Sequence, residues 1–484
     1  MKDHYLQKAE ENLPRLFKTR IHPKYENKTL YKGDTVVLDL LNHYVGYFSF
    51  NLGYLEVYID APVTLRVRFC ETEREIHDDF STYKGRLSAS WLQEDTVNVD
   101  FPGVFRMPRR YAARYIVINI INSPRPLTLT DFEFEAQTCA DTDALPPLNI
   151  DDQRLVDIDR VAVNTLKNCM QRIYEDGPKR DRRLWTGDLR LEALANAYTF
   201  KSYALTRRCL YLFAASEPNE RGMIPGYLYE YPKFVSGSWW IRDYSLLFVA
   251  TLCDYLEHTG DSETFLDIYP AAKAQMDSAD SELDGDGLLM IKTDRDAFID
   301  WCEGLKKVTA LNGVYIYVLD LLVQALKKLG HTDAKLFENR LKNARKCARE
   351  HLYDAKKNAF VNAKDDYQYS VHSTVFMVLA DIIDPSDAKA ALLDALNSQS
   401  SVKPFTPYAH HYVIEAMFKL GLENEAFEYI KSFWGMMVDL GANTFYEAFV
   451  PDDLDFSPYG DRMINSMCHA WSCTPTYFIR KYKG

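Results

Sequence analysis

The sequence predicts a multidomain protein: an N-terminal antiparallel β-sandwich followed by an all-α domain, an (α/α)6 toroid. Before about residue 140, apolar and polar residues alternate with a period of two, which is typical of half-buried strands. After residue 150, apolar residues recur at steps of three and four, which is typical of helices packed by one face. The length of 484 residues also suits two or three domains.

The predicted sandwich covers residues 28–140 and follows an N-terminal extension, residues 1–27. Its alternation is clearest where Leu65, Val67 and Phe69 are separated by arginines. Several short strands separated by turn-rich pieces, with no helical stretch between them, are typical of a sandwich. Further strands are expected at residues 35–41, 44–52, 115–121 and 127–135.

Residues 141–150 are expected to form a linker, because Pro146 and Pro147 interrupt regular structure. The helical, catalytic domain is then expected over residues 151–484, with about ten to twelve helices joined by short loops. That number suits a closed ring of helical hairpins. The clearest predicted helices are residues 155–173, 189–202, 308–329, 334–353, 408–420 and 423–440, with Asp333 and Gly330 as caps.

Charge excludes one class of partner. The net charge is −12 and the chain contains no stripe of Lys and Arg, so no nucleic-acid partner is expected. Neutral or cationic substrates fit this charge better than polyanions. No apolar run approaches membrane-spanning length, so no membrane partner is expected either.

The cysteines and the first residues indicate the compartment. The nine cysteines are scattered, without metal-ligand spacing, and are expected to be free buried thiols, with no metal and no cofactor. The first residues lack the apolar stretch of a signal peptide. We therefore expect a cytoplasmic protein. The sequence does not fix the oligomeric state, and a homodimer is compatible with it.

The segment from Asp176 to Asp188 contains the densest group of candidate functional residues, including Arg180 and Asp181. It lies between two predicted helices, and loops on a rigid scaffold commonly carry active sites. A solvated loop whose Arg and Asp side chains pair with one another would have the same composition. Trp185 favours a site, because its ring requires burial.

A glycosidase needs two carboxyl groups, one on each side of the scissile bond. Glu447, which lies among aromatic residues shortly after a predicted helix, is the candidate for the second group. It could equally be an ordinary charged residue on a strand or loop. Two weaker candidates combine aromatic residues with acids, although either could be core plus surface: Trp239 and Trp240 with Asp243, and Trp301 with Asp300 and Glu303.

At these residues the sequence resembles glycoside hydrolase family 78, the bacterial α-L-rhamnosidases. The similar segments occur in the same order and cover roughly residues 30–480. Residues 44–50 resemble the family's β-sandwich and residues 109–115 its closing strand. The family's acidic signature is similar to residues 176–188, its second acidic segment to 441–447, and its pocket-histidine region to 468–472.

The resemblance implies roles for these residues. Glu447 would be the general base that activates water, in an inverting reaction that needs no cofactor. The remaining candidates would bind or enclose the sugar: Asp176, Arg180 and Asp188 by its hydroxyl groups, Trp240, Trp301 and His469 as pocket walls, with Asp243 as a further substrate-binding candidate.

The general acid is where the sequence departs from the family pattern. Many members have a Glu seven residues before the last Asp of the signature, and here Asp181 occupies that position relative to Asp188. The run is one residue shorter, and the other alignment would place Arg182 there, which cannot donate a proton at neutral pH. We therefore assign Asp181. Its pKa would have to be raised by burial, which two neighbouring arginines oppose.

The resulting prediction is an inverting exo-glycoside hydrolase that releases terminal α-L-rhamnose from small glycosides or oligosaccharides. The short chain favours small substrates, because family members often carry additional modules. Two alternatives stay open: a related (α/α)6 glycosidase acting on another terminal sugar, and a catalytically silent sugar-binding protein.

Overall fold

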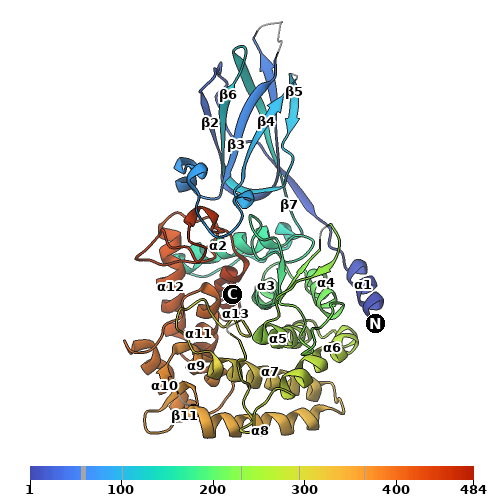
Figure 1. The fold of residues 1–484 in the computed structure, drawn as a ribbon, viewed down its shortest axis with the longest axis vertical. Helices are drawn as coiled ribbons and strands as arrows, with labels where there is room; N and C mark the ends of the chain where they lie inside the picture. The colour runs from blue at the N-terminus through green and yellow to red at the C-terminus, as the bar shows by residue number, and fades with distance from the viewer. Residues whose placement is uncertain (56–60, 101, 231, 294, 365) are drawn as a thin grey trace.

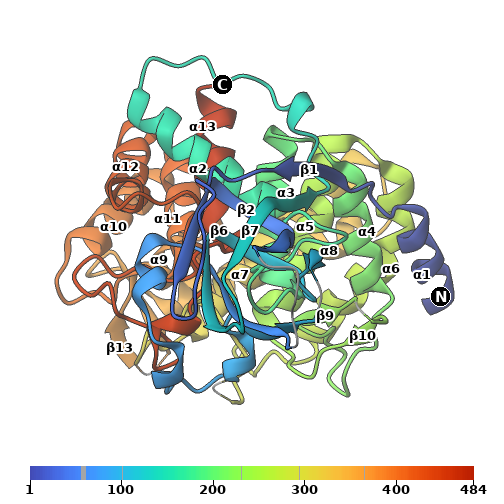
Figure 2. The same cartoon turned by 90° about the horizontal axis from the view of Figure 1, so that it is seen from above.

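The structure is a computed structural model that describes residues 1–484 except 56–60, 101, 231, 294 and 365. A narrow β domain stands on a broader helical domain, so that the molecule is elongated (Figure 1). Seen from above, the strands lie over the centre of the helical domain, and α1, Lys2–Glu11, lies at its periphery (Figure 2).

The N-terminal domain is a seven-stranded sheet in which every pairing is antiparallel. The strand order is β1-β7-β2-β6-β3-β4, and β5 also pairs with β2. The strands are β1 Phe17–Ile21, β2 Thr35–Tyr54, β3 Val63–Cys70, β4 Glu94–Val99, β5 Gly103–Arg106, β6 Tyr111–Asn122 and β7 Leu127–Thr138.

The long strand β2 joins the two halves of this sheet. The sequence predicts two strands here, but the structure has one, interrupted by an irregularity between Asp39 and Tyr44, where Leu41 has a φ of 65°. The first half of β2 pairs with β6, and the second half pairs with β5 and β7. Inward-facing residues of both halves, such as Leu38 and Phe48, belong to one apolar core.

The predicted N-terminal extension carries regular structure. Helix α1 contacts α4, and its Tyr5 and Ala9 are buried there. Strand β1 pairs with β7 along its whole length and so belongs to the sheet. The alternation of apolar and polar residues in β1 is too short to be recognised in the sequence, because a strand of five residues places only two or three side chains on each face.

The helical domain contains twelve α-helices, α2 to α13, among the described residues. Their number agrees with the expected ten to twelve. The helices are α2 Gln153–Cys169, α3 Thr186–Tyr198, α4 Tyr203–Ala214, α5 Arg242–Thr259, α6 Ser262–Asp280, α7 Val308–Lys328, α8 Ala334–Leu352, α9 Val371–Leu379, α10 Pro385–Asn397, α11 Pro407–Lys419, α12 Glu423–Asp439 and α13 Pro475–Tyr482.

Alternate helices contact one another in sequence. Contacts join α3 to α5, α5 to α7, α7 to α9, α9 to α11, and α13 back to α3. The intervening helices contact their neighbours in the chain: α4 contacts α3 and α5, α6 contacts α5, α8 contacts α7, α10 contacts α9, and α12 contacts α11. Helix α12 also contacts α2. Two small sheets that were not predicted from the sequence lie between helices. The first contains β8 Leu184–Trp185, β9 Tyr227–Tyr229 and β10 Val235–Ser236. The second contains β11 Tyr353–Asp354, β12 Ala359–Ala363 and β13 Asp366–Tyr369.

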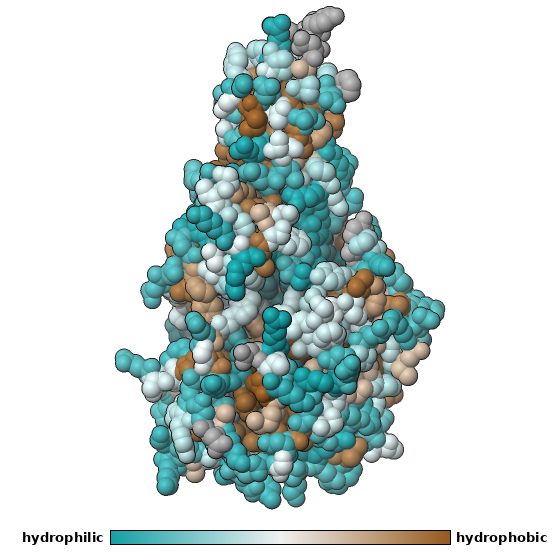
Figure 3. Space-filling view, in the orientation of Figure 1, coloured by the Kyte–Doolittle hydropathy of each residue, from teal (hydrophilic) through white to brown (hydrophobic). Residues whose placement is uncertain are grey.

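Helix α7 corrects one expectation from the sequence. By length and mean hydropathy alone it could cross a membrane, although no such run was expected. Of its apolar window, 78% is buried inside the protein, which is the position of a core helix. On the face drawn in Figure 3, the hydrophobic residues form small patches among hydrophilic ones.

Candidate active site

A small pocket lies among four segments of the helical domain. The segments are the α2–α3 loop, the residues before and at the start of α5, the α6–α7 connection and the α12–α13 connection. The pocket is lined by Asp176, Arg180, Asp181, Trp185, Asp188, Trp239, Ile241, Tyr244, Phe298, Trp301, Glu447, Tyr459, His469 and Trp471.

Asp176 organises the α2–α3 loop. Its Oδ1 accepts a hydrogen bond from the backbone N–H of Arg183 at 3.0 Å, and its Oδ2 accepts one from the N–H of Asp181 at 3.4 Å. Burial and the nearby charge of Asp181 raise the pKa of Asp176 to about 8. The carboxyl group is therefore largely protonated at neutral pH, so it can donate as well as accept hydrogen bonds.

Glu447 is held from three directions. Its Oε1 accepts a hydrogen bond from the Tyr459 hydroxyl at 2.5 Å, and its Oε2 accepts from Arg180 and from the Ser466 N–H, the latter at 3.2 Å. Burial raises the pKa of Glu447, whereas Arg180 opposes this shift. The result is a buried carboxylate in a fixed orientation.

Asp181 faces Glu447 across the same guanidinium. Arg180 Nη2 bonds Glu447, and Arg180 Nη1 lies 3.7 Å from Asp181 Oδ1. Arg183 Nη1 lies 3.1 Å from the other oxygen, Oδ2. Both carboxyl groups contact the same guanidinium, one at each terminal nitrogen. The distance between their oxygens therefore cannot exceed the distance between the two nitrogens plus the two nitrogen–oxygen contacts. That limit includes the spacing of roughly 6.5–9.5 Å found in inverting glycosidases.

Asp188 and His469 bring free hydrogen-bonding capacity to the pocket. Asp188 Oδ1 lies 3.7 Å from His469 Nδ1, and among the described residues neither atom has a hydrogen-bond partner. Burial raises the pKa of Asp188 well above its usual range, and the charges of Asp176 and Glu447 add to this. Burial and Arg180 lower the pKa of His469, so its ring is neutral at neutral pH. Buried polar atoms without partners are rare, and a bound polyol would satisfy them.

Aromatic rings form the pocket walls. Trp301 stands edge-on to Trp471 and Tyr459, with ring centroids 5.0 and 5.8 Å apart, and Phe298 stacks on Trp471. Trp301 was predicted from the sequence, but most of the walls were missed. Trp185 had been noted within the acidic segment and the Trp-Trp pair at 239–240 was a visible signal, whereas the others are isolated in the sequence: Tyr244, Phe298, Tyr459 and Trp471.

Two predicted sugar-binding residues lie outside this pocket. Trp240 lines a neighbouring pocket, and its neighbour Trp239 lines both. Asp243 is fully buried, and its two oxygens accept the backbone N–H groups of Phe298 and Ile299, each at 2.9 Å. Asp243 thus positions the chain that carries Phe298. The other seven predicted residues all line the pocket.

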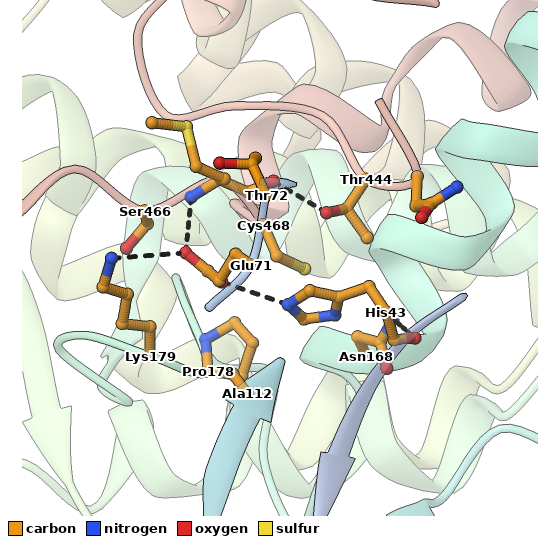
Figure 4. A network of polar contacts seen from close by, with 12 residues as sticks. His43, Glu71, Thr72, Ala112, Asn168, Pro178, Lys179, Thr444, Ser466 and Cys468 are labelled. Carbon is orange, nitrogen blue, oxygen red and sulfur yellow. Dashed lines mark hydrogen bonds and ion pairs between the residues drawn. The ribbon is translucent and has the colours of Figure 1, made fainter. Parts of the chain in front are cut away.

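Residues of the N-terminal domain contact the α2–α3 loop and the α12–α13 connection through a buried polar network (Figure 4). Glu71, just after β3, accepts the N–H of Met467 at 2.8 Å and lies 3.1 Å from the His43 ring nitrogen. Lys179, next to Arg180, donates to Glu75 at 2.8 Å and lies 3.7 Å from Glu71. These bonds tie residues of the β domain to both segments that carry the two carboxyl groups.

Two carboxyl groups that share an arginine, in a pocket walled by tryptophans and a tyrosine, define a site of the glycoside-hydrolase class. Among the described residues, no group of three or more His, Cys, Asp or Glu side chains is placed to hold a metal ion.

Comparisons with known proteins identify the family. Residues 8–139 match the N-terminal domain of glycosyl hydrolase family 78 alpha-rhamnosidases, and residues 147–482 match the bacterial alpha-L-rhamnosidase six-hairpin glycosidase domain. This chain belongs to that family, and it is a glycoside hydrolase. Comparison with curated protein sequences gives no match.

Solved structures agree with this identification. A rhamnosidase from Klebsiella oxytoca, solved with rhamnose bound, is 37% identical with a TM-score of 0.94, over 99% of this chain and 98% of that one. A family 78 rhamnosidase from Bacillus sp. GL1 is 20% identical with a TM-score of 0.78, over 98% of this chain and 48% of that one. The second likeness shows the fold alone.

Proposed function

We propose that this protein is an inverting exo-α-L-rhamnosidase in which Glu447 is the general base and Asp181 the general acid. The observation that carries the proposal is the placement of both carboxyl groups on one guanidinium, that of Arg180, in a small pocket. The rhamnose bound to the Klebsiella oxytoca relative supports the choice of sugar.

The base side of the reaction follows from the contacts of Glu447. Tyr459, Arg180 and the Ser466 N–H fix both carboxylate oxygens, so that the group can orient one water molecule. As this water attacks the anomeric carbon, its proton passes to Glu447. The raised pKa makes Glu447 a stronger base than an exposed glutamate.

On the opposite face, Asp181 donates a proton to the leaving oxygen as the glycosidic bond breaks. The Asp181 side chain is more exposed than that of Glu447, 17% against 4%, which suits this role because the leaving group must extend out of the pocket. The sugar hydroxyls would bond to the protonated Asp176, to Asp188 and to the neutral His469. The apolar face of the sugar would pack on the surrounding rings.

The proposal extends to the architecture and the compartment. We infer an (α/α)6 toroid, supported by the contacts that lead from α3 through alternate helices to α11 and by the contact of α13 with α3. We also infer a β-sandwich, supported by the single core that both halves of the sheet share. All nine cysteines are free, which fits the cytoplasmic location that we propose.

Hydrolysis of 4-nitrophenyl α-L-rhamnoside tests the activity, and proton NMR of the first product tests its stereochemistry. We expect β-L-rhamnose as the initial product. Glu447→Gln should lower kcat on this substrate by roughly 10²–10⁴-fold, the usual contribution of acid–base catalysis. Because 4-nitrophenolate leaves without taking up a proton, the loss from Asp181→Asn should be measured on a rhamnosyl disaccharide, whose leaving alkoxide must be protonated, and should be of similar size.

The exposed acid Asp439 provides a matched control, because it lies in an ion pair with Arg154 outside the pocket lining. Asp439→Asn should leave kcat unchanged. Failure of the wild type to hydrolyse any rhamnoside would contradict the proposal. An Asp181→Asn variant that cleaves a rhamnosyl disaccharide at the wild-type rate would contradict only the assignment of the acid, and α-L-rhamnose as first product would contradict inversion.

A further inference from the structure

A second, larger pocket adjoins the candidate active site and shares two wall residues with it, Trp239 and Tyr459. An exo-acting enzyme holds the terminal sugar in the inner pocket, so the leaving group must pass this common wall. We propose that the second pocket is the leaving-group subsite and that it selects a carboxylate-bearing leaving group, such as a uronic acid. This inference rests on the proposed function.

Two arginines at the second pocket are tied to the shared wall residues. Arg295 accepts a hydrogen bond at its backbone carbonyl from Trp239 Nε1, at 3.1 Å. Arg86 donates its backbone N–H to the carbonyl of Tyr459, at 2.8 Å. The backbone of each arginine is therefore fixed to a residue of the wall that the leaving group must pass.

Ion pairs among the described residues do not neutralise the charges of these two arginines. Asp296 is the carboxylate that lines the pocket, and Arg221 Nη1 bonds it at 3.0 Å. Within the described ranges of the chain, neither Arg86 nor Arg295 has an ion-pair partner. Arg86 Nη2 donates to the carbonyl of Pro458, which orients the guanidinium and leaves its charge uncompensated. Both arginines are exposed, so a ligand can reach their remaining donors.

The pocket thus has a positive rim in a protein whose net charge is −12. The net charge favoured neutral or cationic substrates, but the local arrangement favours an anionic group beside the scissile bond. Arginine also offers the fork of donors that binds carboxylates in two places.

The remaining walls suit a sugar ring. Trp239 is 36% exposed, Trp240 and Tyr227 lie beside it, and Trp239 stands edge-on to Trp185 of the inner pocket. Exposed aromatic rings pack on the apolar faces of pyranoses, while the arginines would bind the carboxylate. Arg86 and Leu87 come from the N-terminal domain, so that domain would contribute directly to substrate selection.

The test compares matched disaccharides: rhamnosyl glucuronate with rhamnosyl glucose, in the α-1,2, α-1,3 and α-1,4 linkages. For at least one linkage, wild-type kcat/KM should be about tenfold higher for the uronate, as expected for a charge-assisted hydrogen bond. This preference should fall in high salt, because exposed charges are screened. Arg86→Gln and Arg295→Gln should each reduce the uronate-to-glucose ratio several-fold, and the double variant should abolish the preference.

Arg349 is the matched control, since it is an exposed arginine on α8, outside both pocket linings. Arg349→Gln should keep the wild-type ratio. Arg295→Glu should shift the preference toward rhamnosyl glucosamine, whose leaving group is cationic. The ratio within one variant cancels any general loss of active protein.

The experiment distinguishes failure of the proposed function from failure of this inference. If the wild type does not cleave 4-nitrophenyl α-L-rhamnoside, the proposed function fails. If it cleaves that substrate but prefers the uronate in none of the linkages, or if the arginine variants keep the wild-type ratio, this inference alone is overturned.

Discussion

At the scale of single residues, the site contains buried carboxyl groups with raised pKa values, two of which line the pocket, while the third, Glu192, lies on α3 outside its lining. Asp176, Asp188 and Glu192 are all buried, and burial raises the pKa of each. Glu192 lies one helical turn beyond Asp188, and in the described structure neither of its side-chain oxygens has a hydrogen-bond partner. Negative charges on these groups would repel one another, so protons are retained in the folded state well above the ordinary range.

This retention predicts how stability changes with pH. The pKa of Asp176 is about 8 in the folded protein, compared with about 3.9 for an unfolded chain. Between these values the folded state binds the additional proton. The contribution of Asp176 to stability is therefore fully present below about pH 4, and it is lost as the pH rises to about 8, by roughly 1.4 kcal/mol per pH unit.

Asp176→Asn removes this titration. Urea unfolding from pH 5 to pH 8 should show a shallower fall in the free energy of unfolding for the variant than for the wild type. Asp439→Asn is the control, because Arg154 lowers the pKa of this exposed carboxyl and it does not titrate in that range. Parallel curves for wild type and Asp176→Asn would show that Asp176 is ionised in the folded protein.

The acids of the site could be predicted from the sequence, whereas several of its walls could not. Asp176, Asp181 and Asp188 lie within one short segment, so their spacing was informative. Tyr459, by contrast, reaches the pocket from a turn in the α12–α13 connection, and nothing local distinguishes it from other tyrosines. For neighbours such as Trp239 and Trp240, the sequence could not say which ring faces the inner pocket.

At the scale of elements, the start of α3 differs from the prediction in a way that shapes the site. The helix was expected from residue 189, but it begins at Thr186, so Asp188 lies in its first turn rather than in the loop. The helix dipole favours a negative charge in the first turn, but burial and the charge of Asp176 outweigh it and raise the pKa of Asp188. For α8 the predicted position is right but the predicted interaction is not. Asp333 is the N-cap residue, but its side chain accepts a hydrogen bond from the Tyr269 hydroxyl instead of capping the helix.

The α2–α3 loop depends on Lys179, which is buried between two glutamates of the N-terminal domain. Replacing it by methionine leaves Glu71 and Glu75 without their cation, and breaking a buried pair typically costs roughly 3–5 kcal/mol. Lys179→Met should therefore lower the free energy of unfolding by that amount. Since Arg180 is the next residue, kcat should also fall, with a smaller change in KM.

Lys18→Met is the matched control. Lys18 is exposed and lies 2.9 Å from Glu135, a surface pair that contributes about 0–1 kcal/mol. Urea unfolding and steady-state kinetics of both variants separate the two cases. Equal effects of the two substitutions would contradict the buried role of Lys179.

At the scale of the whole molecule, the change of period near residue 140 was sufficient to predict two domains, but not how they join. The interface is made by single residues far apart in the sequence. Glu71 meets Met467 there, and Arg110 binds both oxygens of Glu175, at 2.7 and 2.8 Å. Hydrophobic periodicity contains no information on such pairings, because it reports only which face of an element is buried.

These buried bonds predict that the two domains unfold together. Separation of the domains would part Lys179 from Glu71 and Glu75, and Arg110 from Glu175, so neither domain gains by unfolding alone. Scanning calorimetry of the wild type should show one transition whose calorimetric and van't Hoff enthalpies agree. In the double variant Arg110→Gln and Lys179→Met, the coupling is lost and two transitions should appear.

A double variant of exposed residues controls for the number of substitutions. Arg20→Gln with Lys18→Met alters two surface pairs on β1 and should retain the single transition. Two transitions in the wild type would show that the interface does not couple the domains. Because the β domain supplies both this interface and Arg86, the same measurement indicates whether that part of the leaving-group pocket stays in place until the helical domain unfolds.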